Sequence, residues 1–456
     1  MNAGTFLMGC GAGFSGDRTD APGPVVDAIA RSGRPGAIMF ETLAERTLAL
    51  GHVARRANPG AGYEPLLAEL VGPVLPACLR AGIPIVGNFG AANPPAAARL
   101  LQQLAAEAGL PPPRIAVVHG DDIRHAVAAG DLDGMEVWEG DAGLAGDTAE
   151  LIAANVYLGA RPIADALLAG AEIVVTGRVA DPALALGPLV AHFGWDWDDW
   201  DRLAAGTLVG HLLECGSQVT GGYFADPGFK DVPRPEVIGF PIAEVAADGS
   251  AVITKPSGSG GCVTCRTVTE QVLYEVHDPA AYLTPDVSLD VTGIRLAQDG
   301  PDRVAVSGAR GRPAPPSLKA TMSFTGDWIG EAEISYAGPN ALPRARLAAD
   351  VIGKRLDLRD LHLRRRLDLI GALSVFDCDA GSLAAAAAPD LEEVRVRLAV
   401  SGGERRPVDQ AMQEVLALLC CGPAGGGGMR SQVRNRVRTV SYLVPRNRVS
   451  PGFSFV

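Results

Sequence analysis

The sequence has little cysteine, few aromatic residues and no long apolar run. Its 456 residues include eight cysteines at irregular spacing, too few for a disulfide framework and typical of a reducing compartment. No apolar stretch reaches the ~18 residues that a membrane-spanning helix needs, and no secretory leader pattern opens the chain. We therefore expect a cytoplasmic protein without disulfides and without structural zinc.

Positive charge is also scarce. The formal net charge of −12 argues against a nucleic-acid partner and against an anionic membrane surface. The densest basic segments are Arg364–Arg366 and Arg430–Arg438, which are typical of solvated faces. With 47% hydrophobic and 20% charged residues, the composition is that of a folded globular protein.

The first half of the chain alternates short apolar runs with alanine-rich helical segments. This alternation predicts an α/β fold with a mostly parallel sheet and helices on its faces. The runs are Thr5–Cys10, Ala37–Phe40, Pro84–Asn88, Arg114–His119 and Ile173–Thr176. Later segments mix strand-like runs with two helical ones, Pro343–Leu356 and Pro407–Leu419. We predict an α/β domain over residues 1–229 and an α+β domain with glycine-rich loops over residues 230–456.

Polar residues follow the predicted strands at their carboxyl ends. Open α/β sheets bind ligands at those ends, because the loops there meet at one edge of the sheet. We therefore predict that six strand-end residues line one concave site. They are Asp17, Arg18, Glu41, Arg46, Asn88 and Arg178.

The first strand end is rich in glycine. Gly9, Gly11 and Gly13 begin a turn that could hold an anion, but Phe14 breaks the dinucleotide fingerprint. In the frame that does fit, the nearest candidate for a ribose-binding acid is Glu41, ~25 residues on. We expect no nicotinamide or flavin cofactor; a tight turn without a ligand is the alternative.

Two later glycine-containing segments are further candidates. Glu214 follows a predicted helix and could be a general base, with Gln218 as a hydrogen-bond donor; a helix end and domain hinge is the alternative. The segment 255–262 follows a strand and precedes a helix, so its backbone could cradle an anion beside Lys255. Arg430 follows four glycines and could face an anion.

Asp121 and Asp122 come after His119 at another strand end. This cluster could bind a divalent ion or act in acid–base chemistry, but one aspartate is expected to cap the next helix. The remaining histidines carry no recognisable motif.

Several segments, taken in order, resemble the acyclic terpene utilisation AtuA family. They are residues 9–18, 40–47, 88–94, 176–181, 214–223, 257–261 and 421–428. The resemblance covers essentially residues 4–456. It implies a role in the breakdown of acyclic isoprenoids or related branched acids, often as acyl-CoA thioesters, without a settled reaction. Some family members carry an extra ferredoxin-like domain that this chain lacks, so we expect a separate small ferredoxin-like partner. We also expect a homo-oligomer.

Two functions from different classes remain open. The first is a cofactor-independent lyase or hydratase acting on a carboxylate or acyl-CoA, in which Glu41, Glu45 or Glu214 moves a proton. The second is a non-catalytic scaffold or acyl-CoA-binding subunit of a larger complex, such as a biotin-dependent carboxylase. An enzyme would gather the charged side chains around one pocket, whereas a scaffold would leave them in separate ion pairs. The candidate substrate-binding residues are Gly11, Gly13, Asp17, Arg18, Arg46, Asn88, Asn93, Arg178, Asp181, Gln218, Lys255, Ser257, Ser259 and Arg430.

Overall fold

The computed structural model describes residues 4–129, 135–139, 150–372 and 391–456. The chain divides into two compact units. Unit 1 comprises Met1–Ala142, Leu151–Ser323 and Thr439–Val456, and unit 2 comprises Gly143–Glu150 and Phe324–Arg438. These units differ from the predicted division at residues 229 and 230, because strands that follow residue 230 join the sheet of unit 1.

Unit 1 is built on a ten-stranded mixed sheet. Five neighbouring strands at its centre are parallel, and all five were predicted from the apolar runs. In sheet order they are β1 (Thr5–Ala12), β2 (Gly36–Phe40), β3 (Ile85–Gly87), β7 (Ile173–Val175) and β4 (Ile115–His119).

Antiparallel strands extend this centre at both edges, so the sheet is mixed rather than mostly parallel. Beyond β1 lie β8 (Ile242–Ala246), β9 (Ala251–Thr254), β13 (Val304–Ser307) and β12 (Arg295–Gln298), and beyond β4 lies β19 (Gly452–Phe455). The sequence missed this extension because strand pairing over such distances leaves no local pattern.

Helices cover both faces of the sheet, as side chains of β1 show. The Phe6 ring lies 4.6 Å from the His192 ring of α8 (Ala183–Phe193). A Cβ on Gly9 would lie 2.5 Å from Val25 of α1 (Pro22–Ser32). Side chains three apart on a strand point to opposite faces, so α1 and α8 lie on opposite faces.

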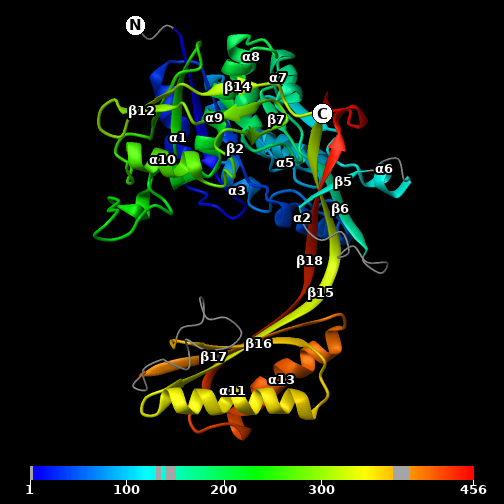
Figure 1. Ribbon diagram of the computed structural model, residues 1–456. Coiled ribbons are helices and arrows are strands. Elements are labelled where there is room, and N and C mark those ends of the chain that lie inside the picture. The colour runs from blue at the N-terminus through cyan, green and yellow to red at the C-terminus, as the bar shows by residue number, and fades with distance from the viewer. Residues whose placement is uncertain (1–3, 130–134, 140–149, 373–390) are drawn as a thin grey trace. The chain divides into compact units, whose positions relative to one another are not determined.

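The other helices of unit 1 connect or flank these strands (Figure 1). Asp199 caps α9 (Trp200–Glu214), because its side chain accepts the Arg202 N–H at 3.2 Å. These other helices of unit 1 are α2 (Glu45–Ala57), α3 (Leu67–Val71), α4 (Leu75–Ala81), α5 (Pro94–Glu107), α6 (Arg124–Ala129), α7 (Arg161–Leu168), α9 (Trp200–Glu214) and α10 (Cys265–Leu273).

Short strands complete unit 1. A three-stranded sheet joins β10 (Tyr282–Leu283), β11 (Ser288–Asp290) and β14 (Arg310–Arg312). Two more strands pair with longer ones: β5 (Glu136–Glu139) with β18 (Gly427–Pro445), and β6 (Leu151–Val156) with β15 (Ser317–Ala337). Within the residues that the structure describes, no helix is both long and apolar enough to cross a bilayer.

Unit 2 follows the order β–α–β–β–α–β. Its sheet order is β16-β17-β15-β18, which is the ferredoxin-like arrangement. Helices α11 and α13 run along one face of this sheet (Figure 1) and cover a core that includes Ile334 and Val396. The elements are β15 (Ser317–Ala337), α11 (Ala341–Leu358), β16 (Arg364–Ile370), β17 (Glu393–Gly402), α13 (Arg405–Cys421) and β18 (Gly427–Pro445).

Candidate functional site

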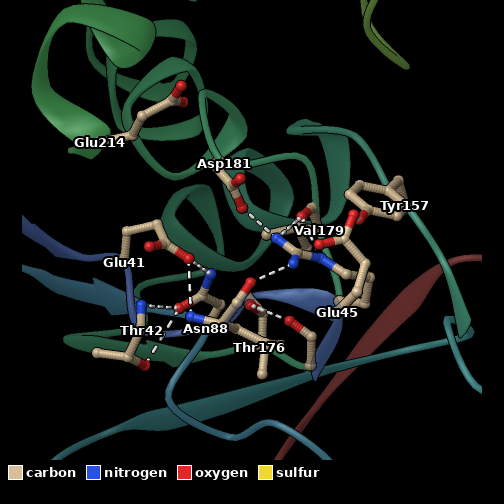
Figure 2. Close-up of polar contacts among 12 residues, drawn as sticks. Glu41, Thr42, Glu45, Asn88, Tyr157, Thr176, Val179, Asp181 and Glu214 are labelled. Carbon is tan, nitrogen blue, oxygen red and sulfur yellow. Dashed lines mark hydrogen bonds and ion pairs between the residues drawn. The ribbon is translucent and has the colours of Figure 1, made fainter. Parts of the chain in front are cut away.

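The carboxyl ends of three neighbouring parallel strands bring predicted site residues together. Glu41 directly follows β2, Asn88 directly follows β3, and Arg178 and Asp181 come shortly after β7. Because β2, β3 and β7 are adjacent in the sheet, Glu41, Asn88 and Asp181 lie near one another at the strand ends (Figure 2). The strand-end rule thus locates the core of the candidate site.

Asn88 organises the segment that follows β2. Its Oδ1 accepts the Thr42 N–H at 2.7 Å, and its Nδ2 donates to Oε1 of Glu41 at 2.9 Å. The Leu43 N–H donates to the same Oε1 at 2.7 Å. Two donors therefore fix one oxygen of Glu41, while Oε2 has no hydrogen-bond partner among the described residues.

The surroundings of Glu41 favour its protonated form. The residue is only 8% exposed, and burial is the main cause that raises the pKa of its carboxyl group. The charge of Asp181 raises this pKa further, against the opposing effects of Arg178 and Asn88. A carboxyl that keeps its proton near neutral pH and has one unengaged oxygen is suited to general acid–base chemistry.

Arg178 is a buried cation at the centre of the cluster. Each of its three guanidinium nitrogens donates within the protein, to the carbonyls of Leu43 and Val179 and to the Asp181 carboxylate. Its guanidinium carbon also lies 4.5 Å from the centre of the Tyr157 ring. This geometry favours a role in holding the strand ends together over the predicted role in binding a substrate anion.

Asp181 connects the acidic groups of the cluster. Figure 2 shows it with Glu41 and Glu214 on one side and Glu45 on the other. Burial is the main cause that raises the pKa of Asp181, and the charges of Glu214 and Glu45 add to it against Arg178. Its side chain is nevertheless 35% exposed, so the cluster is open to solvent at this residue.

Glu45 lies at the start of α2 in a different setting. The Tyr157 hydroxyl donates to its Oε1 at 2.5 Å, and Nζ of Lys319 lies 3.3 Å from the same atom. Burial opposes the charge of Glu45, but these partners outweigh it and lower the pKa to about 2. Glu45 is therefore an anion near neutral pH and, of the three predicted catalytic acids, is poorly suited to donating a proton.

A buried polar chain supports the backbone of Arg178. Its N–H donates to Oδ2 of Asp121 at 2.8 Å, and Asn155 donates to the same oxygen at 2.9 Å. Nε2 of His52 lies 3.1 Å from Oδ1 of Asn155, and burial lowers the pKa of His52 to about 4. The neutral imidazole can thus donate to Asn155, and the chain fixes the end of β7.

His119, Asp121 and Asp122, which the sequence grouped as one cluster, lie in different surroundings. Asp121 belongs to the buried chain, whereas Asp122 accepts the Arg124 N–H at 3.1 Å at the start of α6, the capping contact expected for one of the pair. His119 is exposed at the end of β4. Across the described ranges, no three His, Cys, Asp or Glu side chains are grouped as metal ligands.

Glu214 ends α9 and faces the same cluster. Its Oε1 lies 2.8 Å from Nδ1 of His211, one turn earlier on the helix. Both side chains are buried, at 10% and 2% exposure. The structure therefore places Glu214 near Asp181, with Glu41 on the same side (Figure 2).

Three of the six strand-end residues, Asp17, Arg18 and Arg46, lie in surroundings of their own. Asp17 accepts the N–H groups of Gly13 and Arg18 at 2.8 and 2.7 Å. Arg18 forms an ion pair with Asp20 at 2.8 Å, and Arg46 is exposed on α2. The structure thus joins Glu41 to Asn88 by a hydrogen bond and places Arg178 near enough to act on the charge of Glu41. Among the described residues, no hydrogen bond connects the other three to this group.

The glycines after β1 permit close packing. A Cβ on Gly11 would lie 2.5 Å from the Phe40 ring, and one on Gly13 would lie 2.4 Å from the Cys215 carbonyl carbon. Only Gly16 in this turn has a positive φ, at 89°. Tight contact with β2 and with the segment after α9 therefore explains this glycine pattern.

The segment 255–262 already uses its donors within the protein. Lys255 pairs with Asp302 at 3.0 Å, and the N–H groups of Gly260 and Gly261 donate to protein carbonyls. Ser257 is exposed, and the Ser259 hydroxyl donates to Pro256 O at 2.6 Å. The proposed site therefore does not include this segment.

The remaining candidates lie in separate surroundings. Asn93 donates to the carbonyls of Pro59 and Ala61. Gln218 lies beside the Tyr274 hydroxyl. Arg430 is exposed on β18 within unit 2, and the φ values of 74° and 64° at Gly425 and Gly428 account for two of the glycines before it.

A cavity of about 320 Å³ lies elsewhere in unit 1, between α9 and the ends of β9 and β13. Its charged lining residues already pair with protein groups: Asp201 with Arg310, and Asp248 with Ser250. This cavity therefore offers less chemistry than the Glu41 cluster.

Sequence reasoning missed three members of the cluster. Tyr157 directly follows β6 and Tyr282 lies on β10, and only tertiary packing brings them close to the cluster. His211 carried a usable signal, because residues three apart on a helix share a face and Glu214 was already a candidate.

Comparison with known proteins identifies the family. The model of the acyclic terpene utilisation family protein AtuA matches residues 6–455, nearly the whole chain. No curated protein and no solved structure matches the chain. The chain therefore belongs to the acyclic terpene utilisation family.

Proposed function

We propose that this member of the acyclic terpene utilisation family is a cofactor-independent lyase or hydratase. Its substrate would be a carboxylate or acyl-CoA thioester from the breakdown of acyclic terpenoids or branched acids. The observation that carries the proposal is Glu41, with one oxygen held by Asn88 and Leu43, the other unengaged, and a raised pKa. Adding or removing water next to a carbonyl requires such a proton carrier.

The neighbouring residues support this assignment. Asn88 fixes the orientation of the Glu41 carboxyl. Arg178 holds Asp181 close to Glu41, and the charge of Asp181 opposes the ionisation of Glu41. Asp181 is partly exposed, so a small molecule can approach the cluster from that direction. Burial of Glu41 excludes most of the water that would otherwise solvate its carboxylate and return its pKa to the ordinary value.

The test is turnover by the full-length protein. Straight-chain and 3-methyl-branched enoyl-CoA thioesters and their 3-hydroxyacyl counterparts are the probes, with loss or gain of the conjugated thioester absorbance as the readout. We expect Glu41→Gln to lower turnover by roughly 10²–10⁴-fold, the usual contribution of a general acid–base group. The exposed residue Glu69 on α3 provides the matched control, Glu69→Gln, which should retain full activity.

One observation keeps the non-catalytic alternative in view. Arg18 is engaged in its own surface ion pair rather than in the cluster, as expected for a scaffold or acyl-CoA-binding subunit. A thermal shift with the same thioesters, without turnover of any of them, would favour that alternative. Turnover that Glu41→Gln leaves intact would overturn the assignment of Glu41.

A further inference from the structure

His211 and Glu214 form a buried pair at the end of α9. Nδ1 of His211 lies 2.8 Å from Oε1 of Glu214. The two residues are three positions apart, so the last turn of the helix sets their geometry. The pair lies next to Asp181 and so borders the same cluster as Glu41.

Two atoms of this pair have no hydrogen-bond partner within the described part of the chain. They are Oε2 of Glu214 and Nε2 of His211, and both are buried. A buried polar atom without a partner is costly, so such atoms often serve a ligand or a reaction. The unpartnered carboxyl oxygen of Glu214 is suited to accepting a proton from a bound molecule.

The neighbours of His211 favour its charged form. Burial lowers the pKa of the imidazole, but the Glu214 carboxylate outweighs that effect and raises it overall. The Tyr282 ring lies 5.3 Å from the imidazole, and the carbonyls of Gln271 and Val272 also face it. Asp181, Cys215 and Glu275 complete the surrounding titratable groups.

We propose that Glu214 takes the α-proton of a 3-hydroxyacyl substrate while Glu41 protonates its leaving hydroxyl, and that His211 is a positioning residue that holds Oε1 of Glu214 through its hydrogen bond. This inference rests on the proposed function and specifies its substrate class. The raised pKa of Glu41 suits it to the acid role, and the buried oxygen of Glu214 that has no partner among the described residues suits it to the base role.

The step is balanced in atoms and charge. The α-C–H bond breaks and its proton goes to Glu214, while the C–O bond breaks and Glu41 supplies the proton that turns the hydroxyl into water. A carbon–carbon double bond forms between the two positions. Glu41 ends as the anion and Glu214 as the acid, and exchange of protons with solvent restores both for the next turnover.

The test separates the two proton transfers in heavy water. The probes are 3-hydroxyacyl-CoA thioesters with straight and 3-methyl-branched chains. Mass spectrometry follows deuterium entry at the α-carbon of unreacted substrate, and absorbance follows elimination. Glu41→Gln should lose elimination by roughly 10²–10⁴-fold but keep α-exchange, whereas Glu214→Gln should lose both. Glu214→Asp, which keeps the charge beside His211, should fold normally and exchange slowly.

His211 is tested through the pH profile of α-exchange. His211→Gln keeps a donor near Glu214 but removes the imidazole, whose pKa is raised, so the profile should lose the limb that follows the titration of His211. His192→Gln on α8, outside the cluster, should leave the profile unchanged. An equal loss of rate at every pH in His211→Gln would overturn the positioning role.

The outcomes also distinguish this inference from the proposed function. Wild-type protein that neither exchanges nor eliminates any probe would overturn both. Wild-type activity in which Glu214→Gln still exchanges, while Glu41→Gln does not, would leave the proposed function standing and reverse the roles assigned here.

Discussion

Glu41 and Glu45 are four residues apart, yet their two surroundings set their carboxyl groups in opposite states. On the Glu41 side, amide donors fix one oxygen and the nearest charges include the anion of Asp181, so the pKa rises. On the Glu45 side, a phenol and an ammonium group face the carboxylate, and the pKa falls to about 2. Arg178 lies between the two and interacts with both.

The difference shows that proximity to a buried cation does not by itself decide ionisation. Arg178 favours the anion at both positions, but at Glu41 desolvation and a second carboxylate outweigh it. At Glu45 the hydrogen bond from Tyr157 and the charge of Lys319 add to it. One region is therefore set up for proton transfer and the other for structural support.

The largest expected effect comes from removing the cation that both regions share. Arg178→Met should destabilise the protein by about 3–5 kcal/mol, because it leaves Asp181 and two carbonyls without their donor in a buried site. Urea unfolding followed by tryptophan fluorescence measures this loss. Arg178→Lys, which keeps the charge but not the planar fork, should lose less. Equal stability of Arg178→Met and the parent would contradict the central role of this residue.

The second prediction concerns the pH dependence of stability on the Glu41 side. Glu41 binds its proton more tightly in the folded chain than in the unfolded chain. Wild-type stability should therefore fall as pH rises from the ordinary glutamate pKa to the raised one, by at most ~1.4 kcal/mol per pH unit. Glu41→Gln lacks this loss, so the melting temperature of the variant should rise relative to that of the wild type as the pH increases from 5 to 8. Parallel curves would mean that Glu41 has an ordinary pKa.

The third prediction sharpens the Glu45 side. Tyr157→Phe removes the hydroxyl that donates to Glu45, whose side chain is 39% exposed, so the loss at pH 7 should be only about 0.5–1.5 kcal/mol. A lowered pKa contributes stability above the ordinary value and loses it as pH falls toward about 2. The difference between variant and parent should therefore shrink in acid. Tyr63→Phe is the matched control, and thermal melts from pH 7 to pH 3 provide the measurement.

The smallest effect is expected at Arg46, which the sequence grouped with Arg178. Arg46 is exposed on α2, so Arg46→Gln should change stability by less than about 0.5 kcal/mol. Isothermal titration with an acyl-CoA thioester tests its predicted part in binding an anion. Weaker binding by the variant would place Arg46 at the site despite its exposure, and unchanged binding would separate it from the cluster.

Much of the central sheet follows from the sequence, because short apolar runs between alanine-rich segments have few other stable arrangements. The edge strands do not follow from it, since β8 pairs with β1 across more than 200 intervening residues and β9 then pairs with β8. The length of β15 does not follow from the sequence either, because Gly326 and Gly330 lie within a continuous strand rather than in a turn.

By itself, the sequence determined which residues stand at the ends of the parallel strands, and so selected Glu41, Asn88, Arg178 and Asp181. Strand order and distances between side chains were needed to show which of these candidates share one environment. The tertiary structure alone decided that Arg178 is enclosed while Arg46 is exposed, and that His211 supports Glu214. Charge and identity are local properties of a residue, whereas desolvation and hydrogen-bond partners depend on what the rest of the chain packs against it.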